Sequence, residues 1–398
     1  MHSDISSSPS GAPERVSSFW DDPAKRSLVY QLITLMVVGF IGYYLFSNTI
    51  KNLHRQSIAT GFHFLGKEAS FEIGESLIGY SAASSYARAL CVGILNTLKV
   101  AFIGTALTLF LGTLIGVARL STNWLVSRLA AVYIEIFQDV PVLLQLFFWY
   151  AVFNDSLPAP RQALHPIPGV FLSNRGLVFG VLAHNPVYVY MGGAFLTACA
   201  GVYCLRWWAG KRQDKTGKTF PLLRSGAGIL LGLPLFVWLC GGAPIAMNVP
   251  HLAGFNFSGG VTVSPEFTAL LLGLVLYTAA FVAEIVRSGI QAVSKGQKEA
   301  AMSLGLKPWQ TLNLVILPQS LRIIIPPVTS QMLNLTKNSS LAVAIGFPDF
   351  VSVVNTTINQ TGQAIEGVAM IMTVYLVFSL LTSAFMNWYN GKIALVER

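Results

Sequence analysis

The sequence predicts an all-α integral membrane protein with about eight transmembrane helices. Hydrophobic residues make up 53% of the 398 positions and charged residues only 11%, whereas a soluble domain averages about 25% charged residues. Apolar runs recur at roughly the 20-residue length that a helix needs to cross a bilayer. The net charge of +9 is typical of a membrane protein with basic cytoplasmic loops and does not indicate nucleic-acid binding.

The predicted spans alternate with polar segments rich in Gly, Pro and Asn. Residues 1–26 are rich in Ser, Pro and charged residues, which predicts a flexible tail without a cleavable signal peptide. Residues 391–398 form a second short tail, and 48–91, 154–186 and 244–265 are predicted to be loops. The spans are placed at 27–47, 92–118, 128–153, 187–208, 223–243, 266–289, 322–346 and 366–389.

Basic residues gather in alternate segments between these spans. They are dense in 206–224 and 287–322 and sparse in 48–91 and 154–186. Because loops rich in Lys and Arg stay on the cytoplasmic side, we expect both termini in the cytoplasm and 154–186 in the periplasm.

The chain shows no pattern of a catalytic or cofactor site. The cluster TGKT at 216–219 resembles the end of a phosphate-binding loop, but Arg212 stands where the first glycine belongs, and no apolar strand precedes it. The six His and four Cys lack the spacing of metal ligands. We therefore expect this chain to bind no metal or cofactor and to hydrolyse no ATP by itself.

A polar stretch between two predicted spans, residues 299–319, reads EAAMSLGLKPWQTLNLVILPQ. A helix is expected over 291–303, and Gly305 can adopt the positive φ that often follows a helix. Pro308 suits the first turn of a second helix, and Pro318 is expected to end it. The stretch therefore predicts a helix–turn–helix on the cytoplasmic side.

The small side chains of Ala300 and Ala301 would let another backbone approach closely, with Lys298 and Glu299 at the rim. An amphipathic loop lying on the bilayer surface is the alternative. The spacing resembles the EAA loop of ABC importer permeases, which reads EAA, three residues, Gly, nine residues, Ile, any residue, Leu-Pro. In that family the loop forms coupling helices that dock in a groove of the ATPase subunit. The matching positions are Glu299, Ala300, Ala301, Gly305, Val315 (for Ile), Leu317 and Pro318.

The resemblance extends to other stretches and narrows the family. Residues 93–121, 133–150, 277–297 and 326–350 resemble polar amino acid uptake permeases. The extra spans and residues 164–179 resemble the long permease subunit of general L-amino acid or glutamate/glutamine/aspartate/asparagine transporters.

The family implies a division of the chain. It comprises a first transmembrane helix and periplasmic segment over 27–91 and an ABC type I transmembrane domain over 92–390. That domain carries a periplasmic insert at 154–186 and extra helices within 187–243. One departure is Gln138-Asp139, which stands where relatives carry an Arg-containing motif.

The family also implies an assembly in the bacterial inner membrane. Its expected members are a second homologous permease, two ATP-binding subunits that carry ATP and Mg, and a periplasmic amino acid-binding protein. ATP would favour one of two rigid arrangements of the passage over the other. The alternative is a secondary, ion-coupled amino acid transporter, which would favour buried carboxylates and an inverted repeat, and neither is evident.

Ionisable side chains inside spans are costly and are candidates for the substrate path. Lys337 is the first candidate; the alternative is a structural lysine paired with a neighbouring helix. Glu284 is the acidic candidate; the alternative is an ion pair with Arg287 one turn away. Pro141 is expected to break the third span, either to line a site or as a packing kink. The polar neighbours assigned to Lys337 are Asn334, Asn338, Ser339 and Ser340.

Overall fold

A computed structural model describes residues 23–55, 61–217 and 220–393. Most of the predicted N-terminal tail (1–22) and the end of the C-terminal tail (394–398) lie outside the described residues. The described part contains 7 helices long and apolar enough to cross a membrane, or 8 if one bent pair counts as a span. These helices, with the bent pair, are α1 (Pro23–Arg55), α2 (Tyr86–Arg119), α3 (Trp124–Asp139) with α4 (Val142–Ala151), α5 (Pro186–Thr216), α6 (Leu222–Cys240), α7 (Pro265–Gln291), α10 (Leu317–Asn338) and α12 (Ala364–Ile393).

Every predicted span therefore corresponds to a helix or to the bent pair. An additional helix that was not predicted, α11 (Phe350–Thr361), lies between α10 and α12. It is only 12 residues long, which is too short to give a spanning signal. A short 3₁₀ helix, Ser339–Ile345, connects α10 to the loop before α11.

Helices α2 and α7 form the centre of the molecule and pack closely along each other. Glycines on α2 make this approach possible. A Cβ added at Gly112 would lie 2.7 Å from the Cβ of Val282, and one added at Gly116 would lie 2.7 Å from the carbonyl oxygen of Ala283. Small residues at such contacts are a common means of association between membrane helices, because lipid provides no hydrophobic drive for it.

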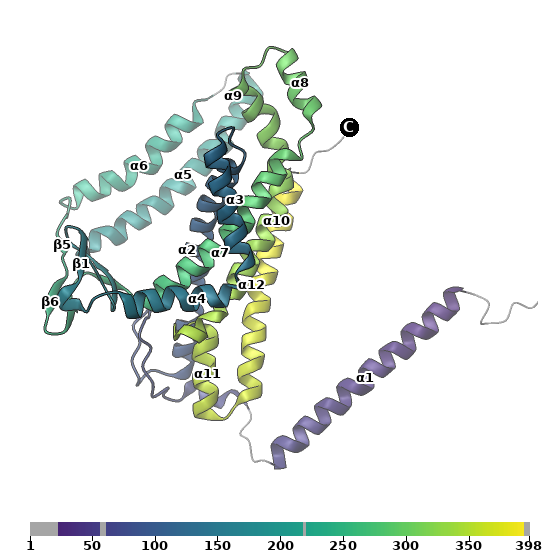
Figure 1. Cartoon of the computed structure of the whole chain (residues 1–398), viewed down its shortest axis with the longest axis vertical. Coiled ribbons are helices and arrows are strands. Elements are labelled where there is room, and N and C mark those ends of the chain that lie inside the picture. The colour runs from purple at the N-terminus through teal and green to yellow at the C-terminus, as the bar shows by residue number, and fades with distance from the viewer. Residues whose placement is uncertain (1–22, 56–60, 218–219, 394–398) are drawn as a thin grey trace, which may run out of the picture.

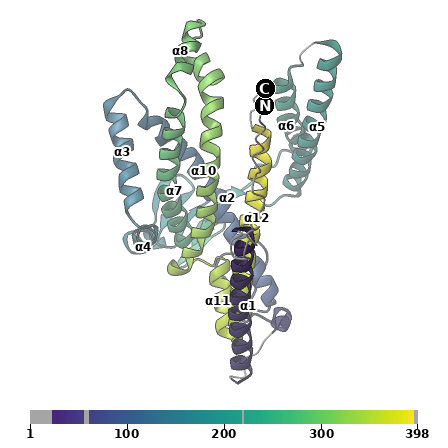
Figure 2. The same ribbon diagram turned by 90° about the vertical axis from the view of Figure 1, so that its right-hand side faces the viewer.

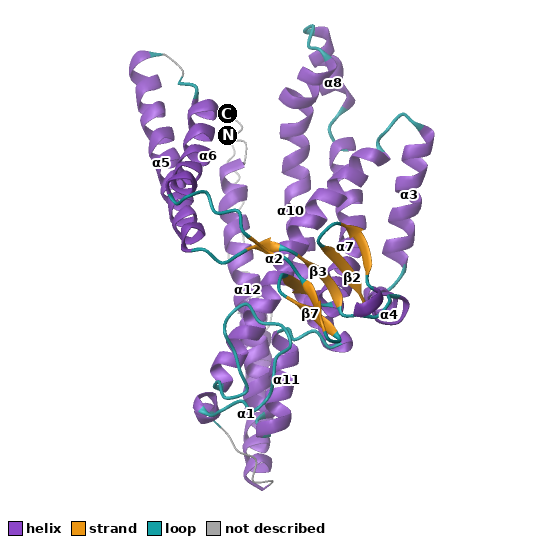
Figure 3. Ribbon diagram, turned by 90° about the vertical axis from the view of Figure 1, so that its left-hand side faces the viewer, coloured by secondary structure: helices purple, strands orange, loops and turns teal. Residues whose placement is uncertain are grey.

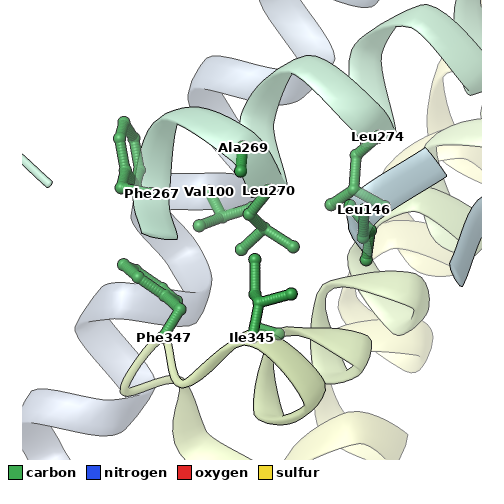
Figure 4. Close-up of a cluster of buried hydrophobic side chains, with 9 residues drawn as sticks. Val100, Leu146, Phe267, Ala269, Leu270, Leu274, Ile345 and Phe347 are labelled. Atoms are coloured by element: carbon green, nitrogen blue, oxygen red, sulfur yellow. The ribbon is translucent and has the colours of Figure 1, made fainter. Parts of the chain in front are cut away.

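A cluster of buried apolar side chains joins four elements near the start of α7 (Figure 4). Leu270 and Leu274 of α7 meet Leu146 of α4 and Val100 of α2, and Phe347 closes the cluster from the loop before α11. The start of α7 is fixed by Ser264, whose hydroxyl accepts a hydrogen bond from the Phe267 amide at 3.1 Å. This cluster holds α4 across the central pair.

The third predicted span is broken at Pro141, as expected, and its two halves meet at 101°. The Gln145 side chain is buried and donates to the carbonyls of Phe137 at 3.1 Å and Val140 at 2.9 Å. A break at membrane depth is tolerated when protein groups satisfy the freed backbone. The span is therefore sharply bent at Pro141, and the Gln145 side chain satisfies two of the carbonyls at the break.

Two segments predicted to be loops instead form small antiparallel sheets (Figure 3). The larger sheet has the order β1-β2-β3-β8, and its last pairing joins strands about 80 residues apart in the chain. The strands have only two to four residues each, too few for an alternating pattern to be recognised. They are β1 (Leu164–Ile167), β2 (Val170–Ser173), β3 (Gly176–Phe179), β4 (Val181–Leu182), β5 (Met247–Asn248), β6 (His251–Ala253), β7 (Asn256–Ser258) and β8 (Val261–Val263).

Helices α5 and α6 form an antiparallel hairpin that stands to one side of the central helices (Figure 2). Its contact face contains the buried Ala194, Ala198 and Gly226. The sheets lie at one end of this hairpin, and the turn between α5 and α6 lies at the other (Figures 1 and 3). Helix α1 stands apart from the remaining helices (Figure 1), and its described side chains are mostly exposed.

Candidate functional site

The stretch that resembles the EAA loop forms two short helices at one end of the molecule (Figure 1). They are α8 (Lys295–Ser303) and α9 (Pro308–Thr311). Between them Gly305 has φ +77°. Its amide donates to the Met302 carbonyl at 2.9 Å, and the Leu306 amide donates to the Ala301 carbonyl at 3.2 Å. This pair of bonds is the Schellman arrangement that ends a helix with a left-handed residue.

The two alanines of the loop have different surroundings. Ala301 is 4% exposed and faces the remainder of the loop, whereas Ala300 is exposed. Large apolar side chains around them also face outward, with Leu304 82% exposed and Trp309 70% exposed. An apolar surface of this kind on a polar loop is typical of a site that contacts another protein or the membrane surface.

The prediction that Pro318 ends the second helix is wrong. The chain continues from α9 through a π-helical turn, Leu312–Ile316, directly into α10. The Leu317 amide donates to the carbonyl of Leu312, and Pro318 stands in the first turn of α10. A wider π turn accommodates a residue that lacks an amide hydrogen, so the proline lies within a continuous helical path.

The loop is therefore joined rigidly to a membrane-spanning helix. A hydrogen bond from the Gln319 side chain to the Gln297 side chain, at 3.3 Å, also ties α10 to α8. Helices α8 and α10 are therefore connected both along the chain and through this side-chain hydrogen bond.

Helix α10 carries an exposed stripe at helical spacing, defined by Ile323, Pro327, Ser330, Asn334 and Lys337. The opposite side is buried against α2 and α7 through residues such as Leu335. Among the described residues, the Lys337 ammonium has no ion-pair partner within 4.0 Å. This stripe places a charge and two polar side chains along a span, on a face that the described residues leave exposed.

The six path candidates do not form one cluster. Asn334 and Lys337 are exposed and Asn338 and Ser340 are partly so, but Ser339 is buried, and its hydroxyl donates to the Thr336 carbonyl at 2.7 Å. Glu284 accepts a hydrogen bond from Nε of Arg287 at 2.8 Å, so it forms the local ion pair named as the alternative.

Glu284 also lies far from Lys337 along the central helices. Leu271 of α7 and Leu335 of α10 both approach Gly104, which sets the relative height of the two helices. At 1.5 Å per residue, Glu284 then lies about 20 Å further along α7 than the level of Lys337.

Two exposed carboxylates that are not among the predicted site residues lie just before the break at Pro141. Glu135 and Asp139 are exposed and lie one turn apart on α3. The rule that selects Lys337, an ionisable side chain inside a predicted span, would have found both. Gln138, at the departure from the family motif, donates to the carbonyl of Ala280 at 3.3 Å and so holds α3 against α7.

A buried carboxylate caps α11 at the end of the molecule opposite α8 (Figure 1). Oδ1 of Asp349 accepts a hydrogen bond from the Ser352 amide at 2.8 Å. Burial raises the pKa of the Asp349 carboxyl from 3.8 to about 7, although hydrogen bonds from the amides of Ser352 and Val351 oppose this shift. The Asp349 carboxyl group caps and packs α11. Among the hydrogen bonds of the described residues, none joins it to a candidate residue of the substrate path.

Comparisons with known proteins agree on one family. The family description "Binding-protein-dependent transport system inner membrane component" matches residues 104–395. The chain is 50% identical over 378 residues to the general L-amino acid transport system permease protein AapQ of Rhizobium johnstonii, with 95% of this chain and 94% of that protein covered. It is 47% identical to the putative amino-acid ABC transporter permease protein YhdX of Escherichia coli, with 95% and 96% covered.

A third relative is the glutamate/glutamine/aspartate/asparagine transport system permease protein BztB of Rhodobacter capsulatus. It is 38% identical over 426 residues, with 99% of this chain and 100% of that protein covered.

Proposed function

The chain belongs to the family of binding-protein-dependent transport system inner membrane components, and from this membership we infer how it works. It is a permease subunit of an amino acid ABC importer with several membrane-spanning helices. The relatives named as amino acid permeases, of which YhdX is named as an ABC transporter permease, support this reading and give no support to a secondary transporter. The remaining question is which parts of the chain couple, conduct and bind partners.

We propose that α8, Gly305 and α9 dock on a separate ATP-binding subunit, which hydrolyses ATP with Mg. The observation that carries the proposal is the exposed apolar surface of Leu304 and Trp309 on a loop that is joined without interruption to α10. A soluble partner would bury this surface. Movement of the docked loop would then tilt or shift α10 and switch the passage between its two arrangements.

The two alanines give a matched test of docking. Ala300→Leu enlarges an exposed position and should leave the loop intact while it blocks close approach of the ATPase. Ala301→Leu enlarges a buried position and should disturb the loop itself. We expect Ala300→Leu to insert normally but to retain at least tenfold less ATPase on co-purification. Full retention of the ATPase by this variant would exclude docking at α8.

We propose that the exposed stripe on α10 lines the translocation path. The path is completed by a second, homologous permease subunit, because one chain leaves the stripe uncovered. A charged residue on a spanning helix is costly unless it faces a partner or an aqueous cavity. Lys337 could pair with the carboxylate of a zwitterionic amino acid, and Asn334 offers both a donor and an acceptor. The relatives' names support L-amino acids, including glutamate and glutamine, as substrates.

We propose an orientation with α8 and the α5–α6 turn in the cytoplasm and the sheets toward the periplasm. In all three ribbon views α8 and this turn lie at the same end of the molecule (Figures 1, 2 and 3). The basic residues of 206–224 favour the cytoplasmic side, and the same orientation puts both termini there. The chain would then lie in the bacterial inner membrane, and a periplasmic amino acid-binding protein would dock at its opposite, periplasmic end.

A single cysteine at position 214, in an otherwise cysteine-free chain, tests the orientation. It should react with a membrane-impermeant reagent only after the cells are opened. Reaction from outside intact cells would reverse the assignment.

A further inference from the structure

The hairpin turn between α5 and α6 concentrates positive charge. The described Lys and Arg side chains between positions 206 and 224 are all exposed, and Asp214 is the only acidic residue in this range. The hairpin has no Lys or Arg at its other end, over residues 183–205 and 225–246. The basic turn is defined by Arg206, Lys211, Arg212 and Lys215 on α5 and Arg224 on α6.

Two of these cations lie over aromatic rings one helical turn earlier. The Lys211 ammonium is 3.7 Å from the centroid of the Trp207 ring, and the Arg212 guanidinium is 5.3 Å from that of Trp208. Phe220, across the turn, meets the Trp208 ring edge to face at 5.5 Å. Tryptophans of this kind mark the boundary between lipid and water, and the cations folded back onto them lie at the same height.

The length of α5 places this group at the bilayer surface. Its 31 residues span about 46 Å at 1.5 Å per residue, whereas the hydrocarbon core is about 30 Å thick. The apolar part, 187–205, is long enough to fill the core. The last three turns, which carry most of the basic turn, then begin at the level of the phosphates and extend into the water beyond them.

The surroundings of the hairpin favour lipid as its neighbour. Helices α5 and α6 pack chiefly on each other, and Trp207 remains 63% exposed beside the cations. Among the described residues, the cations of the basic turn form no ion pair within 4.0 Å. Their charge is therefore available to phosphate oxygens, and the ring faces are available to acyl chains.

We propose that the basic turn, with Trp207 and Trp208, binds the headgroups of anionic phospholipids in the cytoplasmic leaflet. The proposal goes beyond the transport function and uses only the orientation given above. Each Lys or Arg near an anionic membrane surface strengthens binding roughly fivefold. The contact would anchor a hairpin that has little support from the central helices.

The test uses the assembled transporter, purified in detergent and titrated with phosphatidylglycerol or with phosphatidylcholine of the same acyl chains. Native mass spectrometry counts the bound lipid. The variant Lys211→Gln/Arg212→Gln/Lys215→Gln removes three charges from the basic turn. The control Lys51→Gln/Lys67→Gln/Arg175→Gln removes three exposed charges elsewhere.

We expect the wild type to bind phosphatidylglycerol more tightly than phosphatidylcholine. We expect the basic-turn variant to lose about a hundredfold of this affinity, and the control to change by less than twofold. The charge-preserving variant Lys211→Arg/Arg212→Lys should bind like the wild type. If the triple variant fails to assemble, the salt dependence of the wild type decides the question. Its binding of phosphatidylglycerol must weaken as the salt concentration is raised.

Three results would overturn the proposal. The first is equal affinity of the wild type for the two lipids. The second is full phosphatidylglycerol binding by the basic-turn variant. The third is full displacement of the lipid by inorganic phosphate at millimolar concentration, which would show a site for the free ion. If the second result came with loss of ATPase from the variant, the surface would be assigned to the ATPase instead.

Discussion

Substitution of Gly305 tests the coupling loop through backbone strain alone. The residue has φ +77°, and a Cβ added there would meet no other atom within 4 Å. Gly305→Ala therefore introduces no clash. Its cost is that of holding an L-residue in the left-handed region, about 1–2 kcal/mol, which corresponds to a factor of roughly 5 to 30 in a two-state equilibrium.

The size of the effect should follow the conformational preference of the new residue. Asn enters the left-handed region more easily than Ala, and a β-branched residue enters it least easily. We expect substrate-stimulated ATP hydrolysis to decrease in the order Gly, Asn, Ala, Val at position 305. The amount of permease in the membrane should not change, because the spanning helices are untouched.

The matched control is Gly296→Ala in the first turn of α8. An added Cβ there also meets no atom within 4 Å, but the backbone does not have positive φ. Alanine should therefore be neutral or slightly stabilising at this position. Stimulated hydrolysis and uptake that are as high in Gly305→Val as in Gly296→Ala would refute the role of the turn.

Three further predictions address the path, a buried carboxylate and the central helix pair. Lys337→Met should abolish or strongly reduce uptake while the complex still assembles, with partial recovery in Lys337→Arg; normal uptake by the methionine variant would remove Lys337 from the path. Because burial raises the pKa of Asp349 to about 7, the native protein retains a proton that the unfolded chain releases near pH 4. The free energy of unfolding should therefore fall by a few kcal/mol as the pH rises from about 4 to 7, which a lower unfolding temperature of the purified complex would show. Asp349→Asn should flatten this pH profile, and an equally steep profile in the variant would contradict the assignment. Gly116→Val should sharply reduce the yield of folded permease, because its first side-chain carbon would lie 2.7 Å from the Ala283 carbonyl oxygen, whereas Gly39→Val, in open surroundings on α1, should not; equal yields would argue against close α2–α7 packing.

The spans and the turn between α8 and α9 could be predicted because each has a local signal. Apolar length alone locates the membrane helices, and Gly305 and Pro308 fix the turn and the start of α9 through their own backbone preferences. The structure confirms the left-handed turn at Gly305 and the start of α9 at Pro308.

The parts that could not be predicted depend on contacts between distant segments. Strand β3 pairs with β8 although the whole α5–α6 hairpin separates them in the chain, and neither strand is long enough to be recognised alone. The role of Pro318 depends on a π turn that begins six residues earlier, so the expected helix end was wrong. Ser339 was grouped with Lys337 by its proximity in sequence, but the 3₁₀ turn after α10 carries its side chain into the core.

Uptake into sealed proteoliposomes tests the central claim most directly. The vesicles would contain this chain with its partner permease and ATP-binding subunits, and a labelled L-amino acid would be presented with the binding protein on one side. We predict accumulation only when ATP and Mg are supplied on the side of α8, and none when this chain is omitted. Accumulation driven by a proton or sodium gradient without ATP would contradict the account.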